Sequence, residues 1–233
     1  MQTQHKLYAL GIHLYTMSGT VFSFLAPLAL INQDIRVFLV SLFVAVIVDA
    51  TDGTLARKFA ISKIYPHFNG AKLDDLIDYL TYVFLPCMGL VQFNILQSGW
   101  EWMAVVPMLA SLYGFCQENA KTDESFVGFP SYWNIVFLYL YVLEISSQLS
   151  IFTLLVFSLL IFVPLHYIYP TKTRFMKRTT ITLSILYAAA MAVVCLFPHA
   201  QGIYLAAGIS LIYPAYYMSI SLIHHFRITH QPA

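Results

Sequence analysis

Residues 37–48 read VFLVSLFVAVIV, a run of twelve residues without a charge, and Asp49 follows this run directly. The rest of the chain has the same character. Of its 233 residues, 59% are hydrophobic and only 10% are charged, whereas soluble domains have about 25% charged residues. So few charges cannot cover a surface that faces water. The composition therefore indicates an integral membrane protein.

Apolar stretches of similar length recur along the whole chain. They lie roughly at 8–31, 36–52, 73–96, 101–118, 132–148, 150–169, 179–197 and 202–226. A helix needs about 20 apolar residues to cross the hydrocarbon core, and these stretches are continuous, unlike the alternating pattern of barrel strands. We therefore predict an all-α, polytopic transmembrane helical bundle of about eight spans, with residues 1–233 forming a single domain. The least secure boundary is at 146–148, where one kinked segment would resemble two.

The basic residues are distributed unevenly between the two sides of this predicted bundle. Basic residues near span ends stay on the cytoplasmic side of a membrane. With eight spans and an internal N-terminus, Arg36 lies on the outer side. The inner side collects Lys6, Arg57, Lys58, Lys63, Lys72, Lys121, Lys172, Arg174, Lys177, Arg178 and Arg227. This distribution predicts that both termini are cytoplasmic.

The acidic residues are concentrated at the predicted ends of two spans. Five of the eleven acids lie between Asp49 and Asp78. An Asp at the centre of a membrane helix costs on the order of 2.5–3.5 kcal/mol, so acids in such places usually serve a function. Asp49 and Asp52 share a helix face at a spacing of three residues, and Asp74 and Asp78 share another at four. Asp75 lies about 100° away from Asp74 around the helix and is expected to stay outside the group.

Four carboxylates brought together by two adjacent helices would repel one another unless cations lie between them. Ligands that are all oxygens favour Mg²⁺ or Mn²⁺ over zinc or copper. We therefore predict a metal site formed by Asp49, Asp52, Asp74 and Asp78. Between the two pairs, Gly53 and Ala56 leave the backbone open to a bulky ligand. Arg57 offers a planar fork for phosphate oxygens, which indicates a nucleotide substrate.

The segment from Asp49 to Asp78 resembles the signature of the class I CDP-alcohol phosphatidyltransferases, D-x2-D-G-x2-A-R, a spacer, then G-x3-D-x3-D. Every fixed position is present here, as Asp49, Asp52, Gly53, Ala56, Arg57, Gly70, Asp74 and Asp78. Most members have a spacer of eight residues, and here it has twelve. The longer spacer is similar to that of the bacterial phosphatidylcholine synthase branch, which joins choline to the phosphatidyl group of CDP-diacylglycerol. The segments GFPSYWN at 128–134 and YPTKTR at 169–174 also look like that branch.

This resemblance implies a metal-dependent transferase of phospholipid biosynthesis in the bacterial inner membrane, with its active site facing the cytoplasm. It implies two metal ions, magnesium or manganese, held by Asp49, Asp52 and Asp74. Asp78 would be both a metal ligand and the base that deprotonates the acceptor hydroxyl. The residues implied to contact the cytidine diphosphate of the donor are Gly53, Ala56 and Arg57. Relatives also suggest a homodimer, and we expect no nucleic-acid partner.

Choline carries a quaternary ammonium group that has no N–H to donate, so aromatic faces are its best binders. Tyr82 is four residues beyond Asp78 and shares its helix face. The aromatic residues near the predicted cytoplasmic ends of later spans are Tyr113, Phe129, Tyr132 and Trp133. From these candidates we predict a choline site formed by Tyr82, Tyr113 and Trp133, in which the ring face matters more than the hydroxyl.

Other functions remain open at the level of sequence. The acceptor would alternatively be serine, inositol or a glycerol phosphate, or the donor would be CDP-choline with diacylglycerol as acceptor. From another class of protein, a metal-cation transporter would also use intramembrane acids. Against a transporter, the acids lie at one face of the membrane, and Glu144, the only later candidate, lies near the opposite side.

Overall fold

The computed structural model describes residues 2–59, 64, 68–122 and 124–230, with the side chains of 2–9 and 56–58 excepted. Nearly all of its regular structure is helical, with one two-stranded sheet. The predicted all-α class is confirmed. Each of the eight predicted segments coincides with a helical stretch.

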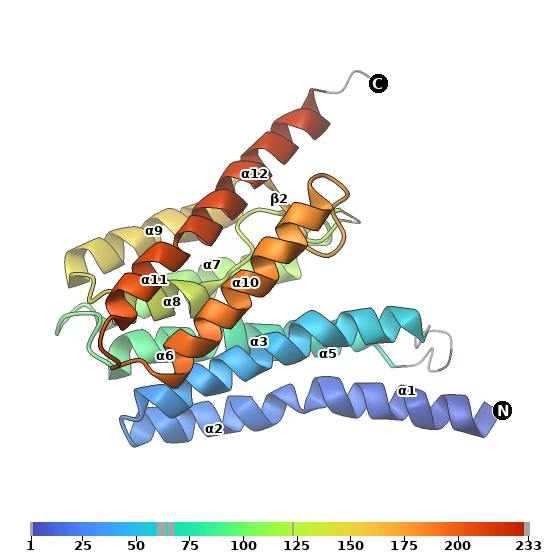
Figure 1. Cartoon of the computed structure of the whole chain (residues 1–233), viewed down its shortest axis with the longest axis horizontal. Coiled ribbons are helices and arrows are strands. Elements are labelled where there is room, and N and C mark those ends of the chain that lie inside the picture. The colour runs from blue at the N-terminus through green and yellow to red at the C-terminus, as the bar shows by residue number, and fades with distance from the viewer. Residues whose placement is uncertain (1, 60–63, 65–67, 123, 231–233) are drawn as a thin grey trace.

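The first three helices form one flank of the molecule (Figure 1). They are α1 (Gln2–Met17), α2 (Gly19–Ile31) and α3 (Ile35–Lys58). At the start of α3, the side chain of Asp34 accepts a hydrogen bond from the backbone N–H of Val37 at 2.9 Å. This bond satisfies one of the unpaired N–H groups at the helix start. α2 then packs against α3, and α3 carries Asp49 at the end of the apolar run.

A second helical stretch runs without a break from α5 (Gly70–Asp78) through the π-helix η1 (Tyr79–Phe84) to α6 (Leu85–Gln92). At the end of η1 the N–H of Leu85 bonds to the carbonyl of Leu80, five residues earlier. Pro86 has no N–H and follows directly, so a local departure from the α-helical bonding pattern is expected here. Such π turns often occur at functional sites.

The remaining helices cover the other side of α3 (Figure 1). They are η2 (Glu101–Ala104), α7 (Val105–Cys116), α8 (Trp133–Val142), α9 (Ser147–Phe162), α10 (Lys177–Leu196), α11 (Ile203–Ser210) and α12 (Ile212–Thr229). α7 packs against α9, and α10 packs against α3. α8 and α9 are separate helices, which resolves the uncertain boundary at 146–148.

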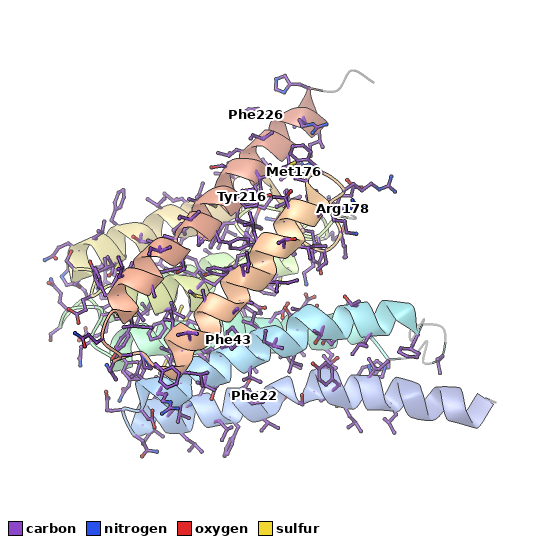
Figure 2. The ribbon with its side chains drawn as sticks, viewed as in Figure 1. Phe22, Phe43, Met176, Arg178, Tyr216 and Phe226 are labelled. Carbon is purple, nitrogen blue, oxygen red and sulfur yellow. The ribbon has the colours of Figure 1, made fainter. Side chains whose placement is uncertain are left out.

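The outer faces of the helices are apolar. Phe24 is 66% exposed, Leu159 is 66% exposed and Ile212 is 70% exposed. Phe226, labelled in Figure 2 near the end of α12, is 56% exposed. Large apolar side chains that face outward around the whole molecule are typical of helices surrounded by lipid.

One predicted segment ends earlier than expected. The apolar stretch 150–169 was predicted as one span, but α9 ends at Phe162. Val163 is extended, as expected before Pro164, because the proline ring disfavours the helical conformation of the preceding residue. The chain then forms β2 (His166–Ile168), which pairs antiparallel with β1 (Ser125–Val127).

Three helical stretches within the described residues are long and apolar enough to cross a membrane. They are Leu10–Ile31, Lys177–Leu196 and Ile203–Thr229. α3 has 24 residues and is also long enough, but it carries the acids. α8 has only 10 residues, which corresponds to about 15 Å and half of the hydrocarbon core. Eight complete crossings therefore remain a prediction.

Candidate active site

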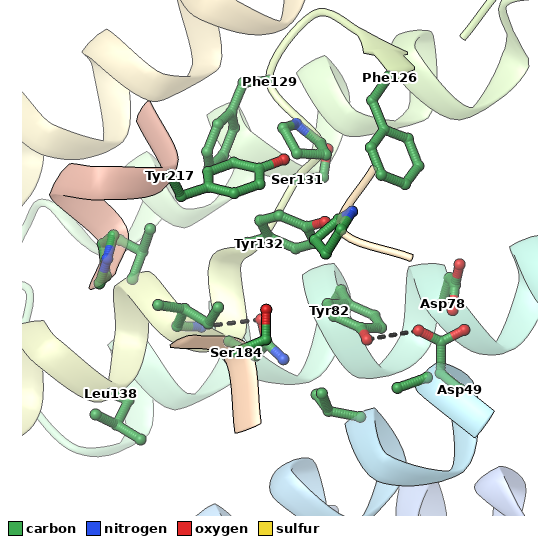
Figure 3. Close-up of a pocket in the computed structure, with 18 of the residues that line it drawn as sticks. Asp49, Asp78, Tyr82, Phe126, Phe129, Ser131, Tyr132, Leu138, Ser184 and Tyr217 are labelled. Atoms are coloured by element: carbon green, nitrogen blue, oxygen red, sulfur yellow. Dashed lines mark hydrogen bonds between the residues drawn. The ribbon is translucent and has the colours of Figure 1, made fainter. Parts of the chain in front are cut away.

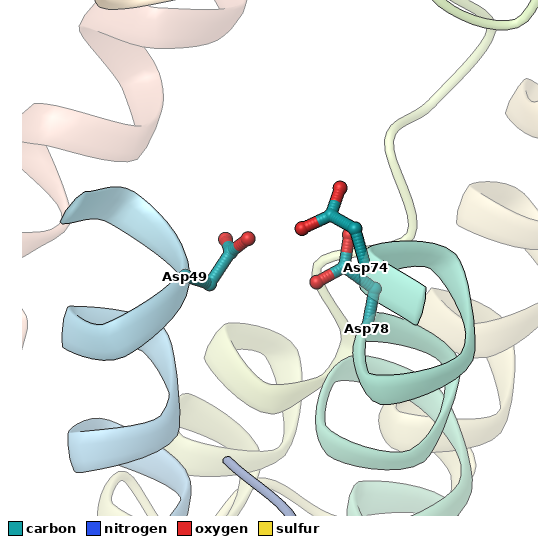
Figure 4. Close-up of side chains that lie close together, drawn as sticks. All are labelled: Asp49, Asp74 and Asp78. Atoms are coloured by element: carbon teal, nitrogen blue, oxygen red, sulfur yellow. The ribbon is translucent and has the colours of Figure 1, made fainter. Parts of the chain in front are cut away.

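Three of the predicted acids lie together between α3 and α5 (Figure 4). One carboxylate oxygen each of Asp49, Asp74 and Asp78 lies within 4.8 Å of the other two. The start of α5 is defined by Asn69, whose side chain accepts the N–H of Lys72 at 3.0 Å. From that start, Asp74 and Asp78 fall one helical turn apart and face α3.

The other two acids have different surroundings. Asp52 lies one turn further along α3 and is only 4% exposed. Asp52 is not one of the three described acids whose carboxylate oxygens lie within 4.8 Å of one another. Its role as a metal ligand therefore stays a prediction. Asp75 is also outside this group of three, and it accepts a hydrogen bond from the ammonium of Lys121 at 2.8 Å.

Lys121 brings a positive charge to the same place. Its ammonium is 3.5 Å from a carboxylate oxygen of Asp74 and 3.8 Å from one of Asp78, in addition to its bond with Asp75. Burial by itself lowers the pKa of Lys121, but the three carboxylates outweigh burial and raise the pKa above its ordinary value. In the sequence, Lys121 is only one of the basic residues that indicate orientation, because no local signal joins it to acids more than forty residues away.

Tyr82, in the π-helix, is bonded to one of the clustered acids. Its hydroxyl donates to a carboxylate oxygen of Asp49 at 2.7 Å, and the side chain is only 8% exposed. The hydroxyl therefore orients a carboxylate that belongs to the candidate metal site. This role differs from the predicted one, in which the ring face was expected to matter more.

A cavity of about 600 Å³ extends from the acids into the bundle. Its walls include residues of α3, α8, α10 and α12, and along α3 it reaches from Thr54 to Leu39. This separation of about fifteen helical steps corresponds to about 22 Å. The far end is lined by apolar side chains, including Leu42, Met191 and Cys195. A polar mouth and a long apolar interior are suited to an amphipathic ligand.

The predicted donor-binding residues are only partly described. Gly53 lines the cavity beside Asp49. The side chains of Ala56 and Arg57 lie outside the described part of the structure, so their predicted contacts with the donor stay predictions.

The structure does not bring the three predicted choline-binding aromatics together. Tyr113 is 50% exposed and its ring lies 4.7 Å from that of Phe162. Trp133 is 1% exposed, and its indole N–H donates to the hydroxyl of Ser111 at 2.8 Å, so it is part of the core. Tyr82 is among the described residues that line the cavity, whereas Tyr113 and Trp133 are not.

Other aromatic side chains line the cavity in their place. They are Phe43, Phe115, Phe126, Phe129, Tyr132, Tyr139, Phe157, Tyr169, Tyr187, Tyr213 and Tyr217. Several come from the segments 128–134 and 169–174, so the motif was a usable signal. Which aromatic within a motif faces inward is decided by the backbone. At Gly128 the φ angle is +82°, and a Cβ there would collide with the carbonyl oxygen of Ile161.

Three clustered acids beside an apolar cavity, in a helical fold with apolar outer faces, agree with the class that the aspartate motif resembles, the CDP-alcohol phosphatidyltransferases. No model of a protein family matches the chain. Several individual proteins, however, are similar to it over most of its length. The phosphatidylcholine synthase of Pseudomonas aeruginosa is 41% identical over 172 residues, which are 73% of this chain and 72% of the relative. That of Legionella bozemanae is 38% identical over 77% of this chain and 87% of the relative.

A third relative, the phosphatidylcholine synthase of Mesorhizobium japonicum, is 32% identical over 78% of this chain and 68% of its own length. These matches extend far beyond the thirty residues of the aspartate motif. The chain belongs to the phosphatidylcholine synthase family.

Proposed function

We propose that this protein transfers the phosphatidyl group of CDP-diacylglycerol to choline, forming phosphatidylcholine and releasing CMP. The observation that carries this proposal is the group of three carboxylates at the mouth of a long apolar cavity. The apolar interior would receive acyl-chain carbons of the donor, and the donor's diphosphate would then lie beside the acids. The similarity to phosphatidylcholine synthases supports choline as the acceptor.

The carboxylate group fits a hard divalent cation. Asp49, Asp74 and Asp78 supply oxygen atoms only, which Mg²⁺ and Mn²⁺ prefer, whereas zinc sites in proteins are usually built on nitrogen and sulfur ligands. We propose that these three residues hold the metal and that Asp52 completes a site for two ions. Bound there, the metal would offset negative charge on the diphosphate of the donor.

The remaining steps belong to the protein's own side chains. The hydroxyl oxygen of choline attacks the phosphorus that carries the diacylglycerol, and the bond from that phosphorus to the CMP oxygen breaks. An alcohol is a poor nucleophile while it keeps its proton, so a base must accept the proton during attack. Asp78 is assigned this role. Lys121 places its ammonium beside the same carboxylates, where it would attract the donor's phosphate groups.

The proposed activity is tested by incubating the purified protein with CDP-diacylglycerol and each of choline, serine, inositol and glycerol phosphate. We expect phosphatidylcholine and an equal amount of CMP with choline alone, with activity lost in EDTA and restored by Mn²⁺ or Mg²⁺. Mass spectrometry identifies the lipid. If a different lipid formed, the acceptor would be the alcohol found in that lipid and not choline. Metal flux into proteoliposomes without any CMP release would favour the metal-cation transporter.

We also propose that the protein lies in the bacterial inner membrane as a single eight-span domain, with both termini and the active site cytoplasmic. The resemblance to the CDP-alcohol phosphatidyltransferases leads us to propose a homodimer as well. Figure 1 shows α1 beginning and α12 ending toward the right of the view, with the turn between α2 and α3 at the left. This arrangement agrees with the uneven distribution of basic residues.

The orientation is tested at the two ends of α7. Ser98 precedes η2 and Asn119 follows α7, and both are exposed. In a Cys116→Ser background, which removes the exposed native thiol, a membrane-impermeant maleimide should label Ser98→Cys from outside. Asn119→Cys should react only after the membrane is permeabilised, because it lies beside Lys121 on the cytoplasmic side. The reverse pattern would contradict the proposed orientation.

A further inference from the structure

A group of aromatic rings lies directly beside the clustered acids. Figure 3 shows Phe126, Tyr132 and Tyr82 on one side of a space and the carboxylates of Asp49 and Asp78 on another. All five residues line the same cavity. The rings of Tyr82 and Tyr132 are 6.0 Å apart, and the hydroxyl of Tyr82 is 2.7 Å from Asp49. Tyr132 is therefore separated from the acids by a single side chain.

The backbone around Tyr132 is held in an uncommon conformation. Ser131 has a φ angle of +56°, which is rare for a residue other than glycine and costs free energy. The N–H of Trp133 donates to the carbonyl of Ser131 at 2.8 Å, and the Trp133 ring is anchored in the core. This tight turn starts α8 and leaves Tyr132 directed into the cavity. Such strain persists where the surrounding structure enforces it, often at ligand sites.

Phe126 is held over the same space by the two-stranded sheet. In β1 it lies opposite Tyr167 of β2, and its ring stacks on that of Tyr169 at 4.6 Å. Tyr169 itself has a cation contact, because the ammonium of Lys172 lies 4.1 Å from its ring centroid. Tyr169 therefore supports the ring of Phe126. The rings of Phe126 and Tyr132 form two walls of the space beside the acids.

We propose that Phe126 and Tyr132, with the ring of Tyr82 as the floor, bind the trimethylammonium group of the acceptor. This inference rests on the proposed function. Aromatic faces attract a quaternary ammonium, and they can do so while the nearby carboxylates are occupied by metal. Choline has two carbon atoms between its nitrogen and its hydroxyl. A trimethylammonium group against these rings therefore leaves the hydroxyl beside Asp78, where deprotonation is required.

The test compares the Michaelis constants for choline and for CDP-diacylglycerol in Tyr132→Leu and Phe126→Leu. Each substitution puts the apolar side chain of leucine in place of a ring and so removes a ring face. The constant for choline should rise by about 2–30-fold, while the constant for the donor and the metal requirement stay unchanged. Tyr132→Phe keeps the ring and should resemble the unaltered protein. Tyr204→Leu, on an exposed ring of α11 outside this site, is the matched control.

A neutral isostere separates charge recognition from shape. In 3,3-dimethylbutan-1-ol a carbon atom replaces the nitrogen of choline, so that the cation–π attraction is lost while the shape is kept. The unaltered protein should prefer choline to this alcohol. In both variants this preference should fall by the same factor as the affinity for choline. If Tyr132→Leu does not fold, Phe126→Leu carries the same comparison at a half-buried position.

The outcomes distinguish this inference from the proposed function. If the unaltered protein makes phosphatidylcholine and both variants keep its choline constant, the aromatic site is wrong and the transferase assignment stands. A rise with Tyr113→Leu instead would return the site to the position expected from the sequence. If no acceptor yields CMP with the unaltered protein, the proposed function itself fails.

Discussion

Asp49→Asn, Asp74→Asn and Asp78→Asn should each reduce phosphatidylcholine formation by at least about 100-fold. Each substitution removes a charged oxygen from the group of three that lies within 4.8 Å. At Asp78 it also removes the proposed base, and a general base contributes about 10²–10⁴-fold to a rate. The measurement is initial velocity at saturating choline over a range of Mn²⁺ concentrations, together with direct Mn²⁺ binding. Metal affinity should fall most in the Asp49 and Asp74 variants.

Asp75→Asn is the matched control for this series. Asp75 adjoins Asp74 on α5 and bonds Lys121, but it is not one of the three acids that lie within 4.8 Å of one another, so its loss should be much milder. Asp52→Asn should also abolish turnover if Asp52 completes a site for two ions. Full activity of the Asp52 variant would reduce the ligand set to the three acids that the structure brings together. Full activity of the Asp49 or Asp74 variant would contradict the metal site as a whole.

Tyr82→Phe should raise the Mn²⁺ concentration needed for half-maximal activity by about 10–100-fold, which is the usual cost of removing a hydrogen bond to a metal ligand. The substitution keeps the ring and deletes only the hydroxyl that donates to Asp49 at 2.7 Å. Without that donor the carboxylate is free to rotate away from the site. Choline affinity should be unchanged, because the ring face stays in place. Metal titrations and choline titrations of the same variant give both values.

The same substitution at an exposed position checks the specificity of this effect. Tyr204→Phe alters a tyrosine that is 61% exposed on α11 and should leave the metal requirement unchanged. If Tyr82→Phe weakened choline binding instead and left the metal requirement intact, the hydroxyl would serve the acceptor rather than Asp49. That result would leave Asp49 oriented by other groups.

Much of this protein was predictable because its determinants are local. The shortage of charge and the length of the apolar stretches identify a helical membrane protein, since lipid permits few alternatives to the helix. The spacings of Asp49 with Asp52 and of Asp74 with Asp78 place each pair on one helix face. Helical periodicity alone is enough for such an inference. The aspartate motif then indicated the family, which the relatives confirm.

The assembly of the site depended on contacts between segments far apart in the chain. Asp49 meets Asp74 and Asp78 because α3 packs against η1, which continues α5, and because α1 contacts both α3 and α5. Lys121 reaches these acids from the loop after α7, and no periodic pattern links a loop residue to a helix so distant. The hydroxyl of Tyr82 meets Asp49 only because the helices that carry them are neighbours.

The aromatic residues show the same division most clearly. Aromatics make up 16% of the chain, so their presence near a predicted span end has little power to select a binding site. Trp133 and Tyr132 are adjacent in sequence, yet one is anchored in the core and the other lines the cavity, because the turn at Ser131 sends successive side chains in different directions. The sequence alone determined the membrane fold, the acids and the family. The tertiary structure decided which side chains surround the acids, because burial and direction depend on packing between distant segments.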